Sequence, residues 1–125
     1  MGKRILVISP TYLSTIDQQA LKYSFDLQGY GTFQLALQNL KRVDWCNLLG
    51  VAFVSDLLPK GEEFKRLISF CSILNKCGSY KFVFVTREVM DHKKFAVLKQ
   101  YSNLDMRESS GHEYISDTVI HRQVF

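Results

Sequence analysis

Two polar residues stand where apolar segments of the sequence end, and they are the first candidates for chemistry. Asp56 follows an apolar run over residues 48–54, and Thr86 closes a second β-rich run over residues 80–85. If both runs are strands of one parallel sheet, the two residues meet at its carboxyl edge, where ligands and chemistry collect in open α/β folds. A carboxylate can hold a hard cation such as Mg²⁺, but Asp56 alone would be a poor site for it.

The elements that would position these residues form one strand–helix–strand unit. The run over residues 48–54 is too continuous for a half-solvated strand and too short for a helix, which is typical of a strand buried on both faces. A helix is predicted from about residue 62 to residue 77, ending before Gly78, which suits the position after a helix. The crossover between the two strands is expected to be right-handed.

The other segments extend this alternation on both sides. Further strands are expected at residues 3–8, 31–37 and 104–108, and further helices at residues 14–27, 39–47, 91–101 and 111–125. The strand at 31–37 rests on period-two alternation, although Phe33 and Leu37 also fit a helix. Five strands alternating with five helices predict an α/β, three-layer αβα sandwich of the flavodoxin-like kind, with a five-stranded parallel sheet in the order 2-1-3-4-5.

Length and composition indicate one domain over residues 1–125, either a minimal protein or the amino-terminal domain of a longer one. A hydrophobic content of 46% and a charged content of 22% are ordinary for a soluble globular protein. The net charge of +4 comes from scattered pairs of basic residues, so no nucleic-acid partner is expected. Membrane insertion is not expected because no apolar run is long enough, and the amino terminus lacks a signal-peptide core, which favours a cytoplasmic location.

The residues most often used in catalysis and metal binding show no useful spacing. The three cysteines are odd in number and lack metal-ligand spacing, so free thiols are expected. The three histidines share no ligand spacing, and the sequence has neither a nucleophile elbow nor a clustered acid/base set. We therefore predict no enzymatic activity, no cofactor and no metal site.

The layout resembles the receiver domain of bacterial response regulators over nearly the whole chain. Asp56, followed by Pro59 and Gly61, is similar to the phosphoacceptor aspartate of that family. Thr86, at the end of the second β-rich run, is similar to the hydroxyl residue that senses the phosphoryl group. Arg107 falls close to the position of the family's lysine, although residues 108 and 109 fit comparably. The resemblance implies a regulatory domain of a signalling protein.

The sequence also departs from the receiver pattern. Receivers carry a pair of acidic residues just after the first strand, which hold a magnesium ion, whereas here that position reads Ser9-Pro10-Thr11. Phosphoryl transfer depends on neutralising charge on the moving group, and the metal does much of that. The sequence therefore predicts a degenerate or pseudo-receiver that is not phosphorylated at Asp56. The simpler alternatives are that Asp56 caps its loop and that Thr86 satisfies a nearby backbone group.

A second hypothesis comes from the loop after the first strand. Its hydroxyl residues Ser9, Thr11 and Ser14 resemble the phosphate-binding loop of flavodoxins, which would hold the phosphate of a flavin or nucleotide. Two features count against this alternative. Tyr12 is bulky where glycine would let the backbone approach a phosphate, and Pro10 removes a donor.

The predicted helix over residues 62–77 suggests how such a domain would act. Besides the stripe expected against the sheet, Phe70, Ile73 and Cys77 form a second apolar stripe. Unless neighbouring helices cover it, this stripe predicts a surface for a protein partner or a homodimer.

Overall fold

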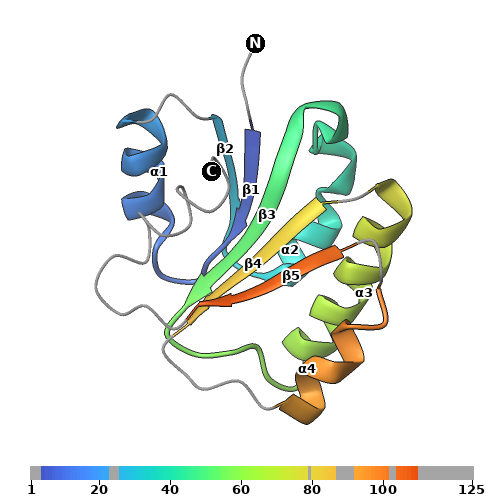
Figure 1. Ribbon diagram of the computed structural model, residues 1–125. Helices are drawn as coiled ribbons and strands as arrows, with labels where there is room; N and C mark the ends of the chain where they lie inside the picture. Colours follow the sequence, from blue (N-terminus) through green and yellow to red (C-terminus); the bar gives the residue numbers. More distant parts are fainter. Residues whose placement is uncertain (1–3, 23–25, 79, 87–91, 102–103, 110–125) are drawn as a thin grey trace.

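The computed structural model describes residues 4–22, 26–78, 80–86, 92–101 and 104–109 (Figure 1). The strands are β1 Arg4–Ile8, β2 Asp26–Tyr30, β3 Leu48–Ser55, β4 Tyr80–Thr86 and β5 Leu104–Ser109. The helices are α1 Leu13–Lys22, α2 Phe33–Gln38, α3 Glu62–Cys77 and α4 His92–Leu98, with short 3₁₀ turns at Leu40–Arg42 and Trp45–Asn47. The predicted final helix over residues 111–125 lies outside the described residues.

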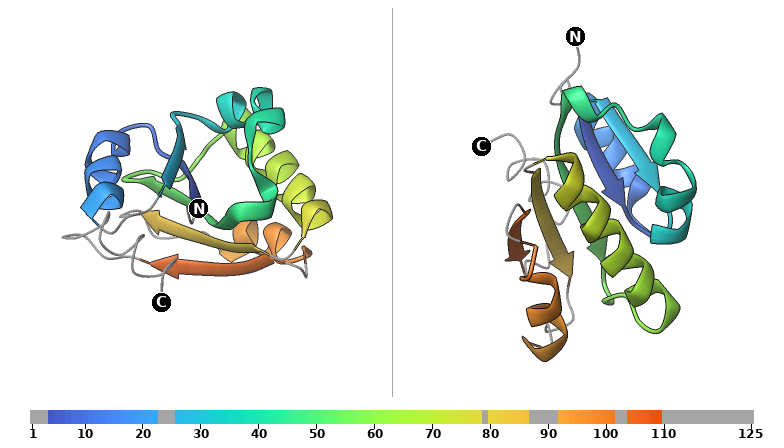
Figure 2. Two further views of the ribbon diagram at one scale, coloured as in Figure 1. Left: turned by 90° about the horizontal axis from the view of Figure 1, so that it is seen from above. Right: turned by 90° about the vertical axis from the view of Figure 1, so that its right-hand side faces the viewer.

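All five strands form one parallel sheet in the order β2-β1-β3-β4-β5, which confirms the predicted fold class and strand order. The central strand β3 pairs with β1 on one side and with β4 on the other. Every residue of β3 except Leu49 is buried, because helices pack on both faces of the sheet. Helices α1 and α3 lie on opposite sides of the sheet (Figure 2).

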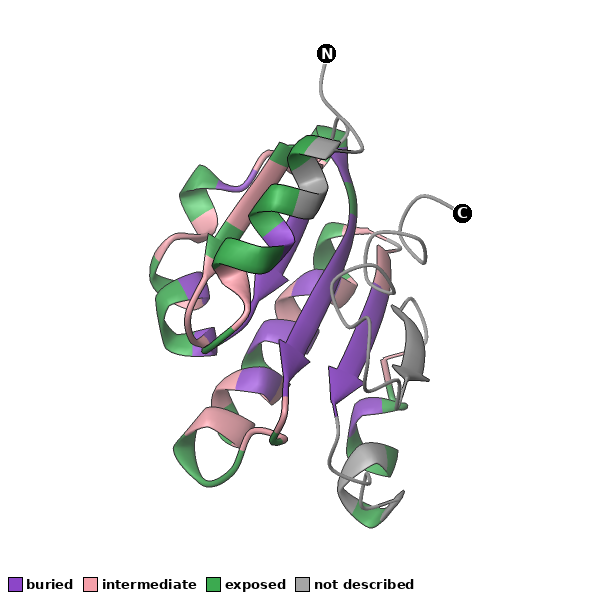
Figure 3. Cartoon of the chain, turned by 90° about the vertical axis from the view of Figure 1, so that its left-hand side faces the viewer, coloured by how far each residue is buried: buried purple, intermediate pink, exposed green. Residues whose placement is uncertain are grey.

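The two faces of the sheet carry different side chains. Alternation along β3 and β4 sends large rings to one face and small aliphatic groups to the other. Rings from α2 and α3 pack against the large rings of the strands, and together they form a set that we call the aromatic cluster: Phe33, Phe53, Phe70, Phe82 and Phe84. The second set, the aliphatic cluster, is Ile5, Val7, Ile16, Ala52, Val54, Val83 and Val85. Helices α2, α3 and α4 contribute buried residues to the face of the aromatic cluster, and α1 contributes one to the aliphatic cluster (Figure 3).

Helix α3 has the bounds that the sequence predicts. It starts after Gly61, which adopts a φ of 60°, and it ends before Gly78, which adopts a φ of 148°. Both values lie in the region that side chains other than glycine avoid. The N–H of Gly78 donates to the carbonyl of Leu74 over 3.2 Å and so closes the last turn.

The prediction that Phe70, Ile73 and Cys77 form an exposed apolar stripe on α3 is wrong for Phe70. Phe70 is fully buried, and its ring lies 5.7 Å from that of Phe33 and 6.1 Å from that of Phe82 between centroids. Ile73 is half-buried and Cys77 is exposed. The helix turns Phe70 toward the sheet because it follows Leu67 by one i+3 step, so both occupy the inner face.

The region around β2 also differs from its prediction. Residues 26–30 form the strand, whereas the predicted strand at 31–37 is helix α2. Phe33 and Ala36 are the buried residues of α2, at helical spacing, and Thr32 caps it by accepting the N–H of Leu35 at 3.1 Å. Helix α1 ends at Lys22 and not at residue 27 because Leu27 belongs to β2. In place of the predicted helix at 39–47 there are only the two 3₁₀ turns.

None of the helices in the described part of the chain combines the length and the apolar character that crossing a membrane requires.

Candidate functional site

The carboxyl edge of the sheet brings the predicted site residues together. Ser9 follows β1, Asp56 follows β3, and Thr86 ends β4. The register pairs Ser55 with Thr86, so Asp56 leaves the sheet beside Thr86. The chain turns toward β2 after β1 and toward β4 after β3, so this edge is the topological switch point of the sheet.

Asp56 is held through both its side chain and its backbone. The hydroxyl of Tyr12 donates to Oδ1 of Asp56 over 2.6 Å, a length typical of a hydrogen bond to an ionised carboxylate. The hydroxyl of the buried Thr86 donates to the backbone carbonyl of Asp56 over 3.2 Å. Thr86 thus satisfies a nearby backbone group, as the simpler of its two sequence interpretations predicted.

The loop after β1 directs Tyr12 toward Asp56. Ser9 is buried, its N–H donates to the carbonyl of Tyr30 over 2.9 Å, and its hydroxyl accepts the N–H of Tyr12 over 2.9 Å. The carbonyl of Tyr12 in turn accepts the N–H of Ile16 over 2.9 Å in the first turn of α1. Ser9 therefore stabilises the turn and fixes the position of the Tyr12 backbone.

The structure gives little support to a phosphate loop at this place. The hydroxyl of Ser9 accepts a bond from the backbone of its own turn. Ser14 is exposed and lies inside α1, which starts at Leu13, so it belongs to the helix and not to the loop. Thr11 is exposed as well and lines the pocket described below.

Arg107 lies farther from the edge than Asp56 and Thr86. It pairs with Val83 in the register of β4 and β5, whereas Val85 pairs with Ser109. Val83 precedes Thr86 by three residues, which is roughly 10 Å along a strand. The side chain of Arg107 lies outside the described residues, so its likeness to the lysine of receiver domains stays a prediction.

The residues at this edge do not fit the magnesium ion of receiver domains. The loop after β1 supplies Ser9, Pro10 and Thr11, which carry no carboxylate. One oxygen of Asp56 already accepts the hydroxyl of Tyr12. Within the described ranges, no group of three or more histidine, cysteine or acidic residues could hold a metal.

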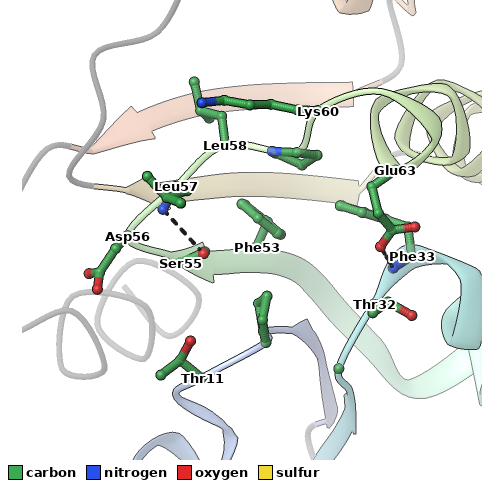
Figure 4. A pocket seen from close by; sticks show the side chains of 13 residues that line it. Thr11, Thr32, Phe33, Phe53, Ser55, Asp56, Leu57, Leu58, Lys60 and Glu63 are labelled. Atoms are coloured by element: carbon green, nitrogen blue, oxygen red, sulfur yellow. Dashed lines mark hydrogen bonds between the residues drawn. The ribbon is translucent and has the colours of Figure 1, made fainter.

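A pocket of about 410 Å³ opens next to Asp56 (Figure 4). Thr11 and Thr32 lie on one side of it, and the loop after β3 lies on the other. Glu63, in the first turn of α3, also lines it, and its Oε1 accepts the N–H of Phe33 over 3.0 Å. The Oε2 of Glu63 lies 3.4 Å from Nη1 of Arg66.

Sequence reasoning missed two residues of this region. In the sequence Tyr12 is an obstacle to phosphate binding, whereas in the structure its hydroxyl contacts Asp56, 44 residues away along the chain. Glu63 was one of several polar residues in a predicted helix, and it reaches the start of α2. A tyrosine in the loop after β1 is a weak signal because a buried tyrosine of the core would look the same in the sequence.

Comparison with known proteins identifies the class of fold. No model of a protein family matches the chain, and no curated protein matches it. Solved structures do match, among them a putative pilus assembly-related protein from Burkholderia pseudomallei, with 13% identity, a TM-score of 0.59 and coverage of 96% of this chain and 87% of that one.

Two signal receiver domains match over 99% of this chain and 91% of their own. One belongs to a putative Luxo repressor protein of Vibrio parahaemolyticus (12% identity, TM-score 0.59). The other belongs to a modulated diguanylate cyclase of Desulfovibrio desulfuricans (19% identity, TM-score 0.58). The chain therefore has the fold of signal receiver domains, as its resemblance to them implied.

Proposed function

We propose that this chain is a non-enzymatic regulatory or assembly domain with the receiver fold, which acts through protein contacts without being phosphorylated at Asp56. The observation that carries the proposal is the hydrogen bond from Tyr12 to Asp56. It occupies a carboxylate oxygen at the position where a receiver would use that group as a nucleophile. In receivers a divalent ion neutralises charge at this position, and in this chain the hydroxyl of Tyr12 contacts the carboxylate.

The position of Thr86 supports the same proposal. A hydroxyl that senses a phosphoryl group must be able to turn toward it, whereas the hydroxyl of Thr86 donates to the carbonyl of Asp56. This bond stabilises the end of β3 in one arrangement. The domain is then a constant binding surface and not a switch driven by aspartyl phosphate.

Exposed apolar side chains are available to contact a partner protein. Leu57, directly after Asp56, is 61% exposed, and Leu21 on α1 is 74% exposed. On α3, Ile73 and Cys77 remain candidates for a partner or homodimer surface. The free thiols of the three cysteines suit a reducing compartment, so the proposal includes a cytoplasmic location.

Phosphorylation is tested by intact-mass spectrometry after incubation with acetyl phosphate and Mg²⁺, and by thermal melting with beryllofluoride and Mg²⁺. We expect no adduct and no shift in melting temperature for the wild type, for Asp56→Asn or for Tyr12→Phe. An adduct on the wild type that is lost in Asp56→Asn would overturn the proposal.

The contact surface on α3 is tested by sedimentation of Ile73→Glu beside Ser69→Glu. Ser69 is an exposed residue of the same helix, so it controls for added charge. If Ile73 belongs to a homodimer interface, Ile73→Glu lowers the sedimentation coefficient and Ser69→Glu does not. Phe70 is unsuitable for this test because it is buried. A wild type that sediments as a monomer would leave a different protein as the partner.

A further inference from the structure

We propose that the pocket beside Asp56 binds an organic cation, namely a primary ammonium or guanidinium group carried on a short apolar stem. This inference goes beyond the proposed function, since it concerns what enters the pocket whether or not Asp56 is ever modified. It rests on the place of the pocket in the fold, on its apolar lining and on the sign of the charges that face it.

The fold opens the pocket at a place where α/β proteins bind ligands. Pro10 and Thr11 belong to the loop after β1, Gly31 and Thr32 to the loop after β2, and residues 55–60 to the end of β3 and the loop after it. Because the connections after β1 and β3 run in opposite directions, a crevice forms between them. A volume of about 410 Å³ falls within the range of roughly 300–1,000 Å³ that is common for small-ligand sites.

The lining is mainly apolar and includes two aromatic rings. Phe33 and Phe53 stack with their ring centroids 5.4 Å apart and an interplanar angle of 23°. Leu58 and Pro59 add aliphatic surface from the loop after β3. Both rings are almost fully buried and stack on each other, so they supply apolar contact and no open ring face. Such a lining favours an apolar stem.

The charged side chains around the pocket favour a cation. Asp56 and Glu63 lie at opposite ends of it, and Lys60 lies along Leu58, on the side of the loop away from Thr11 and Thr32 (Figure 4). The amine of Lys60 does not point into the pocket, and the carboxylate of Asp56 is directed away from the other labelled side chains and accepts the hydroxyl of Tyr12. Glu63 is therefore the carboxylate that lies toward the pocket.

Glu63 is the group best placed to contact the ligand. The N–H of Phe33 fixes its Oε1, while Oε2 contacts Arg66 over 3.4 Å. That ion pair is about one third exposed, with side-chain exposures of 35% and 30%, so it is weak. A carboxylate has about four lone-pair sites, so these contacts orient Glu63 and leave room for a further donor.

An anion fits the same pocket poorly. Pro10 and Pro59 have no N–H to offer, and the N–H of Phe33 is donated to Glu63. The hydroxyl oxygen of Thr32 accepts the N–H of Leu35 as the cap of α2. Pro10, Pro59 and Phe33 therefore offer no N–H to a phosphate.

The proposal is tested by amide NMR of the full chain titrated with butylammonium, with butanol as the neutral probe of the same shape. We expect saturable shifts at Gly31, Thr32 and Leu58 with butylammonium, and at least about tenfold weaker binding of butanol, since a partly exposed charge contact contributes on that scale. Glu63→Gln keeps an oxygen acceptor for Phe33 and should weaken butylammonium binding by a similar factor. Equal binding of the two probes, or no saturable shift, would overturn the proposal.

Two pairs of variants separate a local effect from a general loss of charge. Glu62→Gln removes the neighbouring carboxylate, which is not part of the lining and pairs with Lys65 at the surface. It should leave binding unchanged, and an equal loss in both variants would contradict the proposal. Thr11→Lys places a cation at the exposed rim and should abolish binding, whereas Ser14→Lys, exposed on α1, should not.

The source of the cation is distinguished by a third probe, N-acetylarginine amide. Tighter binding of this probe than of butylammonium would indicate a basic side chain of a partner protein. Tighter binding of butylammonium would indicate a free amine. Either order supports a cation site, and binding of neither probe would overturn it.

Discussion

The aromatic cluster and the carboxyl edge of the same sheet are held together by different physics. The cluster consists of rings with centroids 4.7–6.5 Å apart, and it depends on apolar periodicity along β3, β4 and α3. The edge depends on single hydrogen bonds between particular atoms, such as the one from Tyr12 to Asp56. A fold can therefore persist while the chemistry at its edge changes, because the packing depends on rings whereas the contacts of Asp56 depend on the hydroxyls of Tyr12 and Thr86.

The sharpest test of this division is Phe82→Ala in the aromatic cluster. Phe82 is fully buried and stacks on Phe84 with centroids 4.7 Å apart. Removing the ring should lower the free energy of unfolding by about 3–5 kcal/mol, since a large cavity remains. Urea denaturation measures this. Val83→Ala on the opposite face is the control, with an expected loss of roughly 2 kcal/mol. A larger loss for Val83→Ala than for Phe82→Ala would contradict the comparison.

A smaller effect is expected when the edge is changed by Tyr12→Phe. The variant removes one hydroxyl that donates to a half-buried carboxylate, so the free energy of unfolding should fall by about 1–2 kcal/mol. Tyr80→Phe is the matched control, because the Tyr80 hydroxyl donates to a neutral carbonyl, that of Trp45, over 3.1 Å. Its loss should be nearer 0.5–1 kcal/mol. Equal losses would mean that the charge of Asp56 adds nothing to the bond.

Thr86→Val should cost about 1 kcal/mol, because it keeps the shape of the side chain and removes the hydroxyl that donates to the carbonyl of Asp56. Urea denaturation again measures the loss. The double variant with Tyr12→Phe shows whether the two bonds act together on Asp56. Losses that simply add would indicate that side chain and backbone of Asp56 are held independently.

The smallest perturbation is alkylation of cysteine thiols, which compares the buried face of α3 with its exposed carboxyl end. Burial raises the pKa of the Cys71 thiol to about 12, so at pH 8 almost none of it is thiolate. Cys46 and Cys77 are exposed. Alkylation of the native chain at pH 8 should modify Cys46 and Cys77 and leave Cys71 intact, as peptide mass mapping can show. In denaturant all three should react, and fast modification of Cys71 in the native chain would contradict its burial.

The sequence predicts the parts of the fold where burial dominates. β3, α3 and β4 were placed within a residue or two, because a long apolar run and a clear helical stripe leave few alternatives. β2 was misplaced because its residues are polar and half-exposed, so they carry no apolar signal. In the next segment the apolar residues of α2 alternate, a pattern that predicts a strand.

The candidate site was predicted less completely. The strand ends placed Asp56 and Thr86 correctly at the edge, since parallel strands end together. The roles of Tyr12 and Glu63 depend on loops that meet only after folding, so spacing along the chain carries no information about them. Phe70 packs against Phe33 of α2 as well as Phe82 of β4, and the alternation of residues 31–37 predicts a strand where that helix lies.

The strand β2 bears on how copies of this chain can meet. It forms one end of the sheet, spans five residues from Asp26 to Tyr30, and includes Gly29. A long, flat and apolar border invites strand addition from another molecule and, in the extreme, fibre growth. A short border that begins with a carboxylate and contains a glycine is a poor template for such growth. Assembly of this chain is therefore expected to use helices and loops, and extension of the sheet past β2 is disfavoured.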